Sequence, residues 1–302
     1  MPDRTPQPHR SSRAAPPGEG RIVLAATPIG NLQDASDRLR SLLAEADLIA
    51  AEDTRTARRL CDQLGVHPRG RFVAHHEHNE QASAAGLLEQ VRHGAQIVVV
   101  SDAGMPVVSD PGHRLVQAAA AQGLTVTCAP GPSAVTTAIA LSGLPTDRFA
   151  FDGFLPRRSA ERRRAFEAIR AEPRTVAFFE SPRRVAASLT ELAEALGEDR
   201  PVCLARELTK LHEEIVRGDA GSLLAWARER EAGEGIRGEI VLVVGPATAQ
   251  ADEPAGEEQL VAEVEQLTAS GTRMKEAVAT VAAAHGARAR ELYDAVLRSR
   301  RG

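Results

Sequence analysis

The strongest constraint on the fold is an alternation, from Arg21 onward, between short apolar runs and longer amphipathic stretches. Runs such as Ile97–Val100 do not alternate apolar with polar residues, which is typical of strands buried on both faces of a parallel sheet. Strands and helices alternating at this spacing predict an α/β domain. We expect strands over 21–26, 46–51, 71–74, 96–101 and 124–129, and helices over 35–45, 54–64, 80–92 and 111–122.

A second set of elements begins after Pro130-Gly131-Pro132. Several of its strands follow one another closely, which favours antiparallel pairs. We expect strands over 149–154, 175–180, 201–206, 213–218 and 239–244, and helices over 133–142, 159–171, 183–196 and 219–230. Residues 248–258 have the composition of a linker, and the Ala-rich remainder predicts two or three helices. The expected organisation is a disordered tail at 1–20, α/β domains at 21–130 and 131–246, and a small helical domain at 258–302.

The composition excludes several classes of function. A length of 302 residues exceeds what one compact core usually supports. Aromatic residues are only 3% of the chain, so a platform that stacks successive bases of a single strand is not expected. A net charge of −4 argues against binding a polyanion over the whole surface, although a local basic patch is compatible with it.

The cellular compartment follows from the cysteines and from the apolar segments. Cys61, Cys128 and Cys203 lie far apart and suggest reduced thiols of an intracellular protein. No segment approaches the roughly 18 apolar residues of a membrane span, and residues 1–20 lack the hydrophobic middle of a secretory signal. We therefore expect a cytoplasmic protein with no membrane partner.

Two motifs that suggest nucleotide or metal sites do not fit their context. Gly233, Gly235 and Gly238 spell GxGxxG, but they precede a strand instead of following one, so they indicate a turn. The stretch from His75 to Glu80 is rich in histidine, yet neighbouring side chains do not converge on one ion. We interpret that stretch as a polar loop facing a substrate, and no metal is expected.

Three loops rich in Gly and Pro directly follow expected strands: TPIGN at 27–31, SDAGMPVVSDPG at 101–112 and APGPSA at 129–134. In an open α/β sheet, ligands bind beyond the carboxyl ends of the strands. Gly104 and Gly131 would let the main chain approach a ligand closely. Each loop alone is more often a turn, but all three at one sheet edge favour a cofactor site.

These segments occur in a specific order. They are LAATPIGNLQDASDRLRSLLAEADLIAAEDTRTARRL, HEHNE, SDAGMPVVSDPG, APGPSA, FDGFLPRR, FFESPRR and ARELTKLHEE. Together they resemble the small-subunit ribosomal RNA methyltransferase I family, within the tetrapyrrole-methylase superfamily of S-adenosylmethionine enzymes. The resemblance runs over about residues 21–245, and the pattern of Lys275, Ala279, Ala283, Gly286, Tyr293 and Leu297 resembles that family's helical tail domain.

The resemblance implies two α/β domains with the cofactor in the cleft between them, a homodimer, and S-adenosylmethionine as cofactor. An adenine needs an apolar slot, and the zwitterionic methionine end needs donors and acceptors. The residues that the resemblance places beside the cofactor are Pro28, Asp102, Ala103, Gly104, Pro106, Ser133, Ala134, Phe179, Ala205, Gly238, Glu239 and Ile240.

Two charged motifs have alternative interpretations. The side chains of Glu52 to Arg55 either face the cleft or cap the following helix. Runs of arginine usually mark a solvated face, but here they follow FLP and ESP beside the expected cleft, where RNA phosphates would require them. The expected RNA contacts are Arg55, His78, Arg157, Arg158, Arg162, Arg163, Arg164, Arg183 and Arg184.

Three functions remain open at this point: methylation of a ribosomal RNA ribose, methylation of a tetrapyrrole carbon, or no catalysis, in an assembly factor that only binds RNA. The basic segment and the helical tail favour RNA. The resemblance implies the 2′-oxygen of a cytidine in 16S rRNA of the small ribosomal subunit. A ribose hydroxyl is a weak acid, so a base is expected.

The expected base is one of the carboxylates Glu180, Glu52 and Asp53, with Glu77 and His78 as weaker candidates. Glu180 is preferred because it ends a strand beside both the cofactor loops and the arginines. The alternative is that Glu180 forms an ion pair with Arg183 or Arg184.

Overall fold

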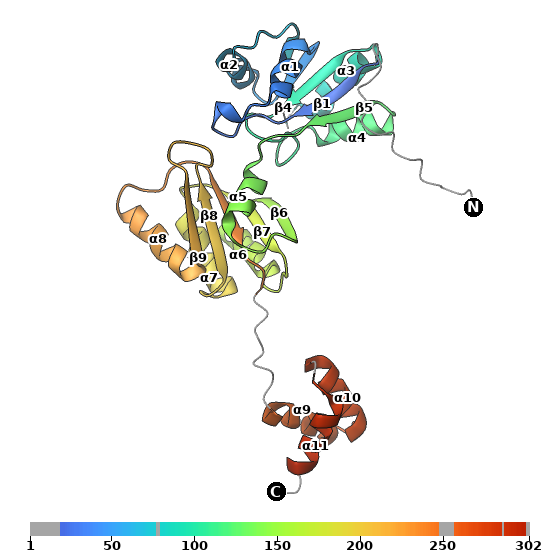
Figure 1. The fold of residues 1–302 in the computed structure, drawn as a ribbon, viewed down its shortest axis with the longest axis vertical. Coiled ribbons are helices and arrows are strands. Elements are labelled where there is room, and N and C mark those ends of the chain that lie inside the picture. The colour runs from blue at the N-terminus through green and yellow to red at the C-terminus, as the bar shows by residue number, and fades with distance from the viewer. Residues whose placement is uncertain (1–18, 77–78, 248–256, 286, 300–302) are drawn as a thin grey trace, which may run out of the picture. The chain divides into compact units, whose positions relative to one another are not determined.

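The computed structural model describes residues 19–76, 79–247, 257–285 and 287–299. The chain divides into two compact units, with the boundary between Pro246 and Ala247. The first unit holds two five-stranded sheets and their helices, and the second is helical (Figure 1). The expected tail at 1–20 and linker at 248–258 lie almost wholly outside the described residues.

The first sheet is entirely parallel, with strand order β3-β2-β4-β1-β5. Alternate residues of its strands supply opposite cores: Ile97 and Val99 pack with α3 and α4, and Val98 and Val100 with α1 and α2. The prediction of strands buried on both faces is confirmed for β2 and β4, whereas no residue of the edge strand β3 is buried. The elements are β1 (Arg21–Ala25), α1 (Asp37–Glu45), β2 (Leu48–Ala51), α2 (Thr54–Leu64), β3 (Arg71–Ala74), α3 (Glu80–Arg92), β4 (Gln96–Val100), α4 (His113–Ala121) and β5 (Thr125–Ala129).

Local capping explains where the helices of this sheet begin. Residues Leu32–Asp34 form a 3-10 turn, η1, before α1. The Ser36 hydroxyl then accepts a hydrogen bond from the Leu39 amide at 3.0 Å, so α1 starts two residues later than its apolar pattern suggests. Gly112, at φ 121°, ends the loop before α4 in a backbone conformation that a helix cannot contain.

The second sheet is mixed, with strand order β6-β7-β10-β8-β9. Strands β6 and β7 are parallel, and the other pairs are antiparallel, as the close spacing of those strands predicts. Helices α6, α7 and α8 cover one face and α5 the other. The elements are α5 (Ala134–Ser142), β6 (Phe149–Phe154), α6 (Ser159–Ala168), β7 (Thr175–Glu180), α7 (Val185–Leu196), β8 (Pro201–Arg206), β9 (Glu214–Asp219), α8 (Ala220–Ala232) and β10 (Ile240–Val244).

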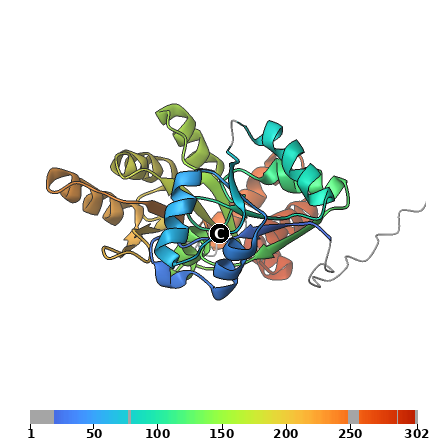
Figure 2. The same cartoon turned by 90° about the horizontal axis from the view of Figure 1, so that it is seen from above.

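The two sheets contact each other through their loops. Ile29, from the loop after β1, packs into the apolar core on the α5 face of the second sheet. The Asn31 amide donates a hydrogen bond to the Thr209 hydroxyl at 3.2 Å. Helices α3 and α8 lie at opposite ends of this unit in both views (Figures 1 and 2).

The second unit contains α9 (Glu257–Ala269), α10 (Met274–His285) and α11 (Ala289–Ser299). These helices share their own apolar core, in which Val264, Val278 and Val296 are buried. Among the described residues, no helix combines the length and apolarity that crossing a bilayer requires.

The cysteines are free thiols, and Cys61 and Cys203 are buried in the cores of the two sheets. Burial raises the pKa of each of these two thiols to about 11. They are therefore structural side chains, as the sequence predicts.

Candidate functional site

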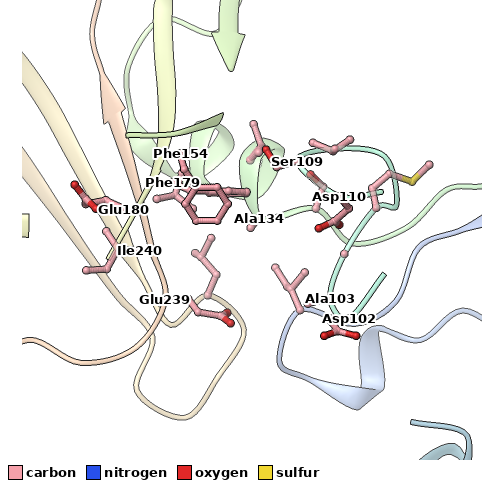
Figure 3. Close-up of a pocket in the computed structure, with 18 of the residues that line it drawn as sticks. Asp102, Ala103, Ser109, Asp110, Ala134, Phe154, Phe179, Glu180, Glu239 and Ile240 are labelled. Atoms are coloured by element: carbon pink, nitrogen blue, oxygen red, sulfur yellow. The ribbon is translucent and has the colours of Figure 1, made fainter. Parts of the chain in front are cut away.

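A cavity of about 360 Å³ lies between the loops of the first sheet and the strand ends of the second (Figure 3). This volume is within the roughly 300–1,000 Å³ typical of small-molecule sites. The lining combines apolar with polar side chains, as a ligand with a nucleoside and a charged end would need. The lining residues are Ile29, Asp102, Ala103, Gly104, Met105, Val108, Ser109, Asp110, Ser133, Ala134, Val135, Phe154, Phe179, Glu180, Ser181, Pro182, Leu208, Gly238, Glu239, Ile240 and Val241.

The wall from the first sheet is built by a backbone bridge between two of its loops. Thr27 and Gly104 exchange both main-chain hydrogen bonds, at 2.9 and 3.1 Å. Gly104 has φ +81°, and a Cβ added there would lie 3.2 Å from Cγ2 of Ile29. The positive φ favours glycine, and a Cβ would be in tight contact with Ile29, so the main chain itself forms the cradle.

Backbone strain is concentrated around this cavity. Within the described residues, the non-glycine positions with positive φ are Val107 (77°), Ser109 (61°), Glu207 (51°) and Thr209 (65°). The first two belong to the loop after β4, and the other two flank the lining residue Leu208. A β-branched residue such as Val107 is a genuine outlier there. Strain of this kind persists where the surrounding structure fixes it, most often at functional sites.

Most of the predicted cofactor residues meet at this cavity. Asp102, Ala103, Gly104, Ser133, Ala134, Phe179, Gly238, Glu239 and Ile240 line it. Pro28, Pro106 and Ala205 do not line it and are buried. Ala205 is fully buried in β8, where it pairs with the lining residue Val241. Ala205 therefore supports the wall from behind.

Asp110 is the most distinctive lining residue that the sequence analysis did not select. Its carboxylate points into the cavity (Figure 3). Desolvation and the negative charge of Glu52 raise its pKa to about 6, against a lowering hydrogen bond from Ser101. The sequence carries a signal for this residue, since Asp110 lies within the Gly/Pro-rich loop at 101–112, but glycine and proline there point to the main chain and not to a carboxylate.

Glu180, the preferred base, is held by structural partners. Its side chain is fully buried and points away from the cavity (Figure 3). The carboxylate accepts hydrogen bonds from the Ser181 amide and the Ser188 hydroxyl and pairs with the Arg184 guanidinium. The ion pair with Arg184 is therefore formed, and it leaves the carboxylate poorly placed to accept a proton from a substrate.

In the motif from Glu52 to Arg55, one carboxylate caps the following helix and the other lies near the cavity loop. Asp53 caps α2: its carboxylate accepts from the Arg55 amide at 2.8 Å and pairs with the Arg55 guanidinium. These hydrogen bonds lower the pKa of Asp53 to about 2. Glu52 is half-buried, and desolvation followed by the charge of Asp102 raises its pKa. The Asp53 amide donates to the Asp102 carboxylate at 3.2 Å, which ties this motif to the cavity loop.

Arg162 corrects the predicted RNA surface. Its guanidinium is buried and forms two 2.8 Å hydrogen bonds with Glu191 of α7, so it does not face RNA. The helical period of α6 turns this arginine inward. Arg55, Arg157, Arg158, Arg163, Arg164 and Arg183 are exposed, Arg184 is half-buried, and His78 with Glu77 lies outside the described residues.

His75 and His76, from the histidine-rich stretch between His75 and Glu80, are described by the structure. His75 is buried, and its Nδ1 lies 2.7 Å from the Ser83 hydroxyl. Burial lowers the pKa of His75. Over the described ranges, no group of three or more His, Cys, Asp or Glu side chains is arranged to hold a metal ion.

Residues 21–224 match the family model of the Tetrapyrrole (Corrin/Porphyrin) Methylases. The chain is 50% identical to the ribosomal RNA small subunit methyltransferase I of Mycobacterium bovis, over 93% of this chain and 96% of that protein. It is 42% identical to the protein of the same name from Escherichia coli O157:H7, over 95% of this chain and 98% of that protein.

Solved structures of lower identity share the fold. The methyltransferase CobJ has a TM-score of 0.54 at 23% identity, covering 76% of this chain and 95% of its own. Uroporphyrin-III-C-methyltransferase from Thermus thermophilus has a TM-score of 0.52 at 18% identity, covering 78% of this chain and 98% of its own.

Proposed function

The chain belongs to the ribosomal RNA small subunit methyltransferase I family of the tetrapyrrole methylases, and from this premise we propose that it methylates a cytidine ribose 2′-oxygen in 16S rRNA. The observation that carries this proposal is the extent of the match. The RNA methyltransferases match over 93–95% of this chain. The solved tetrapyrrole methyltransferase from Thermus thermophilus covers 78% of it. The named relatives match at 42–50% identity, whereas the solved tetrapyrrole methyltransferase, at 18% identity, shows the fold alone, so the sequence relatives support an RNA substrate.

The cofactor is S-adenosylmethionine, whose positively charged sulfur supplies the methyl group. The cavity fits this molecule, because the main chain at Gly104 forms a cradle in which a Cβ would be in tight contact with Ile29, and because the lining is mixed. We assign the adenosine to the apolar wall of Ala134, Leu208 and Ile240, and the charged end to Asp102 and Ser133. The main task of these residues is positioning, which contributes about 7–11 kcal/mol in well-oriented reactions.

We propose Asp110 as the proton acceptor, with Glu52 as a residue that tunes it. Asp110 lines the cavity and points into it (Figure 3), and a base is most effective when its pKa lies near the working pH. The pKa of Asp110 is raised to about 6. Of the earlier candidates, Asp53 caps α2 and Glu180 is enclosed by donors. An assembly factor without activity would need neither this carboxylate nor the cofactor cradle.

Asp110→Asn is expected to lower turnover by about 10²–10⁴-fold with little change in cofactor or RNA affinity. In the wild type, kcat/KM should rise as the pH increases through about 6, because the carboxylate form increases, and then level off. Steady-state kinetics from pH 5 to pH 8 measure both. An unchanged turnover in the variant would exclude Asp110 as the base.

Stability provides the control for this variant. The pKa of Asp110 is higher in the folded protein, about 6, than its ordinary value of 3.8. The folded state therefore binds the proton more tightly, and stability is lost as the pH rises from about 4 to about 6. Asn carries no charge, so Asp110→Asn should be at least as stable as the wild type at pH 8.

The exposed arginines are the proposed RNA surface. If Arg157, Arg158 and Arg163 contact phosphates, RNA affinity should fall steeply with salt, with a log–log slope that decreases by about 0.7–0.9 for each contact removed. Charge-removing substitutions there should leave cofactor affinity unchanged. Arg92→Gln is the control, because Arg92 ends α3, which packs on the first sheet, whereas the substituted arginines lie before and within α6, which packs on the second. An RNA affinity that does not change with salt would show that these arginines face solvent and do not contact phosphates.

Transfer of a labelled methyl group into purified small ribosomal subunits, compared with uroporphyrinogen, tests the function itself. The product RNA should resist alkaline cleavage at one position, since a 2′-O-methyl group removes the attacking hydroxyl. A methyl group found on a base would refute the reaction type, and labelling of uroporphyrinogen alone would refute the substrate. We further propose a homodimer, which sedimentation equilibrium would reveal or disprove.

A further inference from the structure

Strand β6 contains one more residue than its pairing with β7 needs. Phe151 pairs with Ala177, and the next pair in register is Phe154 with Phe179. Three steps along β6 therefore correspond to two along β7. Gly153 accommodates the extra residue with φ +71°. Such bulges bend a strand and redirect a side chain, frequently beside functional sites.

The extra residue changes the face on which Phe154 lies. Ala150 packs against the core under α6, α7 and α8, and Phe151 packs on the opposite face. Strict alternation would place Phe154 on the face of Ala150. Instead, Phe154 lies on the same face as Phe151 and Phe179. Its ring centroid is 5.1 Å from that of Phe179, and the Phe151 centroid is 4.9 Å from it, both in edge-to-face geometry. The bulge thus brings Phe154 to the cavity.

Phe154 lines the cavity and yet remains 64% exposed. An exposed phenylalanine forgoes hydrophobic stabilisation, and this chain has only seven phenylalanines, one tyrosine and one tryptophan. Val108, from the loop after β4, also lines the cavity and is 38% exposed. A Cβ on Gly153 would lie 3.7 Å from the Ser109 hydroxyl, so strand and loop meet at this mouth.

Cationic side chains follow Phe154 closely. Arg157 and Arg158 are exposed. The buried Arg162 guanidinium donates to the carbonyl oxygens of Pro156 and Arg157, at 3.2 and 3.3 Å, and so fixes the turn between the aromatic ring and the charges. An exposed aromatic face with guanidinium groups held nearby matches an unstacked base and its phosphates.

We propose that Phe154 stacks on the base of the nucleotide whose ribose is methylated, a base that is splayed out of the RNA into the mouth of the cavity. This inference rests on the proposed function and adds the residue that receives the base. The cofactor's adenosine is assigned to a separate apolar wall, Ala134, Leu208 and Ile240, of which Leu208 and Ile240 are buried. One stacked base is also compatible with a chain so poor in aromatic residues.

The test measures binding of the full chain to unmethylated small ribosomal subunits, and separately to S-adenosylhomocysteine, for three variants. Phe154→Ala should weaken RNA binding by about 5- to 150-fold, the range that corresponds to losing one base–aromatic stack, with unchanged affinity for S-adenosylhomocysteine. Phe154→Tyr should restore RNA binding. Phe149→Ala is the matched control, because Phe149 begins the same strand and is 44% exposed; it should bind RNA like the wild type.

Several outcomes would overturn the inference. Wild-type RNA affinity in Phe154→Ala would show that Phe154 does not stack on a base. A parallel loss of affinity for S-adenosylhomocysteine would show that the ring contacts the cofactor instead. Equal losses in Phe149→Ala would indicate a general effect on β6. Binding does not depend on methyl transfer, so a methyl group found on a base would refute the proposed reaction and leave this result standing. A wild type without RNA affinity would refute both.

Discussion

Gly104→Leu is expected to abolish binding of S-adenosylhomocysteine in calorimetric titration, with a loss of affinity above about 100-fold, or about 2.7 kcal/mol. Even a Cβ at this position would lie 3.2 Å from Ile29, and a larger side chain must occupy the cradle or displace the lining. The bridge between Gly104 and Thr27 holds the backbone in place and prevents it from moving aside.

Gly65→Leu is the matched control for this substitution. Gly65 ends α2 with φ +65°, and nothing lies within 4 Å of a Cβ added there. Both leucines therefore carry the cost of a left-handed conformation, about 1–2 kcal/mol, but only one lies in the cavity wall. Binding in Gly104→Leu that equals binding in Gly65→Leu would show that the cofactor lies elsewhere.

Arg162→Ala should lower the free energy of unfolding by about 3–5 kcal/mol, because it leaves the Glu191 carboxylate buried without its charged partner. The loss would also free the carbonyl oxygens of Pro156 and Arg157. Urea denaturation at pH 7 measures the change, and the midpoint should fall at a constant slope.

The neighbouring residue supplies the control. Arg163 lies 3.8 Å from Glu194, with both side chains more than half exposed, so Arg163→Ala should change stability by no more than about 1 kcal/mol. Replacing both Arg162 and Glu191 by methionine should recover much of the loss, since a buried pair is often replaceable by apolar residues. Wild-type stability in Arg162→Ala, together with weakened RNA binding, would return Arg162 to the RNA surface.

The sequence predicts the elements of this fold well because each carries its own local signal. Apolar runs without alternation predict the parallel sheet, and Gly/Pro-rich loops at strand ends predict where a cavity forms. Most of the lining residues chosen from these loops do meet there. Main-chain cradles are predictable because glycine and proline mark them in the sequence.

The side-chain contacts were harder to predict because they depend on distant partners. A run of arginines does not reveal that Arg162 faces Glu191, 29 residues later. The partner Ser188 that encloses Glu180 lies on the next helix, so the role of that carboxylate depends on packing. Phe154 cannot be placed from the strand pattern at all. Strict alternation along β6 assigns it to the wrong face of the sheet, and only the pairing with β7 reveals the bulge.

The position of β10 in the second sheet has a consequence for the growing chain during synthesis. β10 pairs with β7 on one side and β8 on the other, although it is the last strand to be synthesised. The first sheet is complete once β5 has emerged at Ala129. Until Ile240–Val244 follows, β7 and β8 each lack the strand that pairs with one of their edges in the folded protein. During synthesis there is therefore a long interval in which the first sheet has all its strands, while strand edges of the second sheet are unpaired and can associate with other chains.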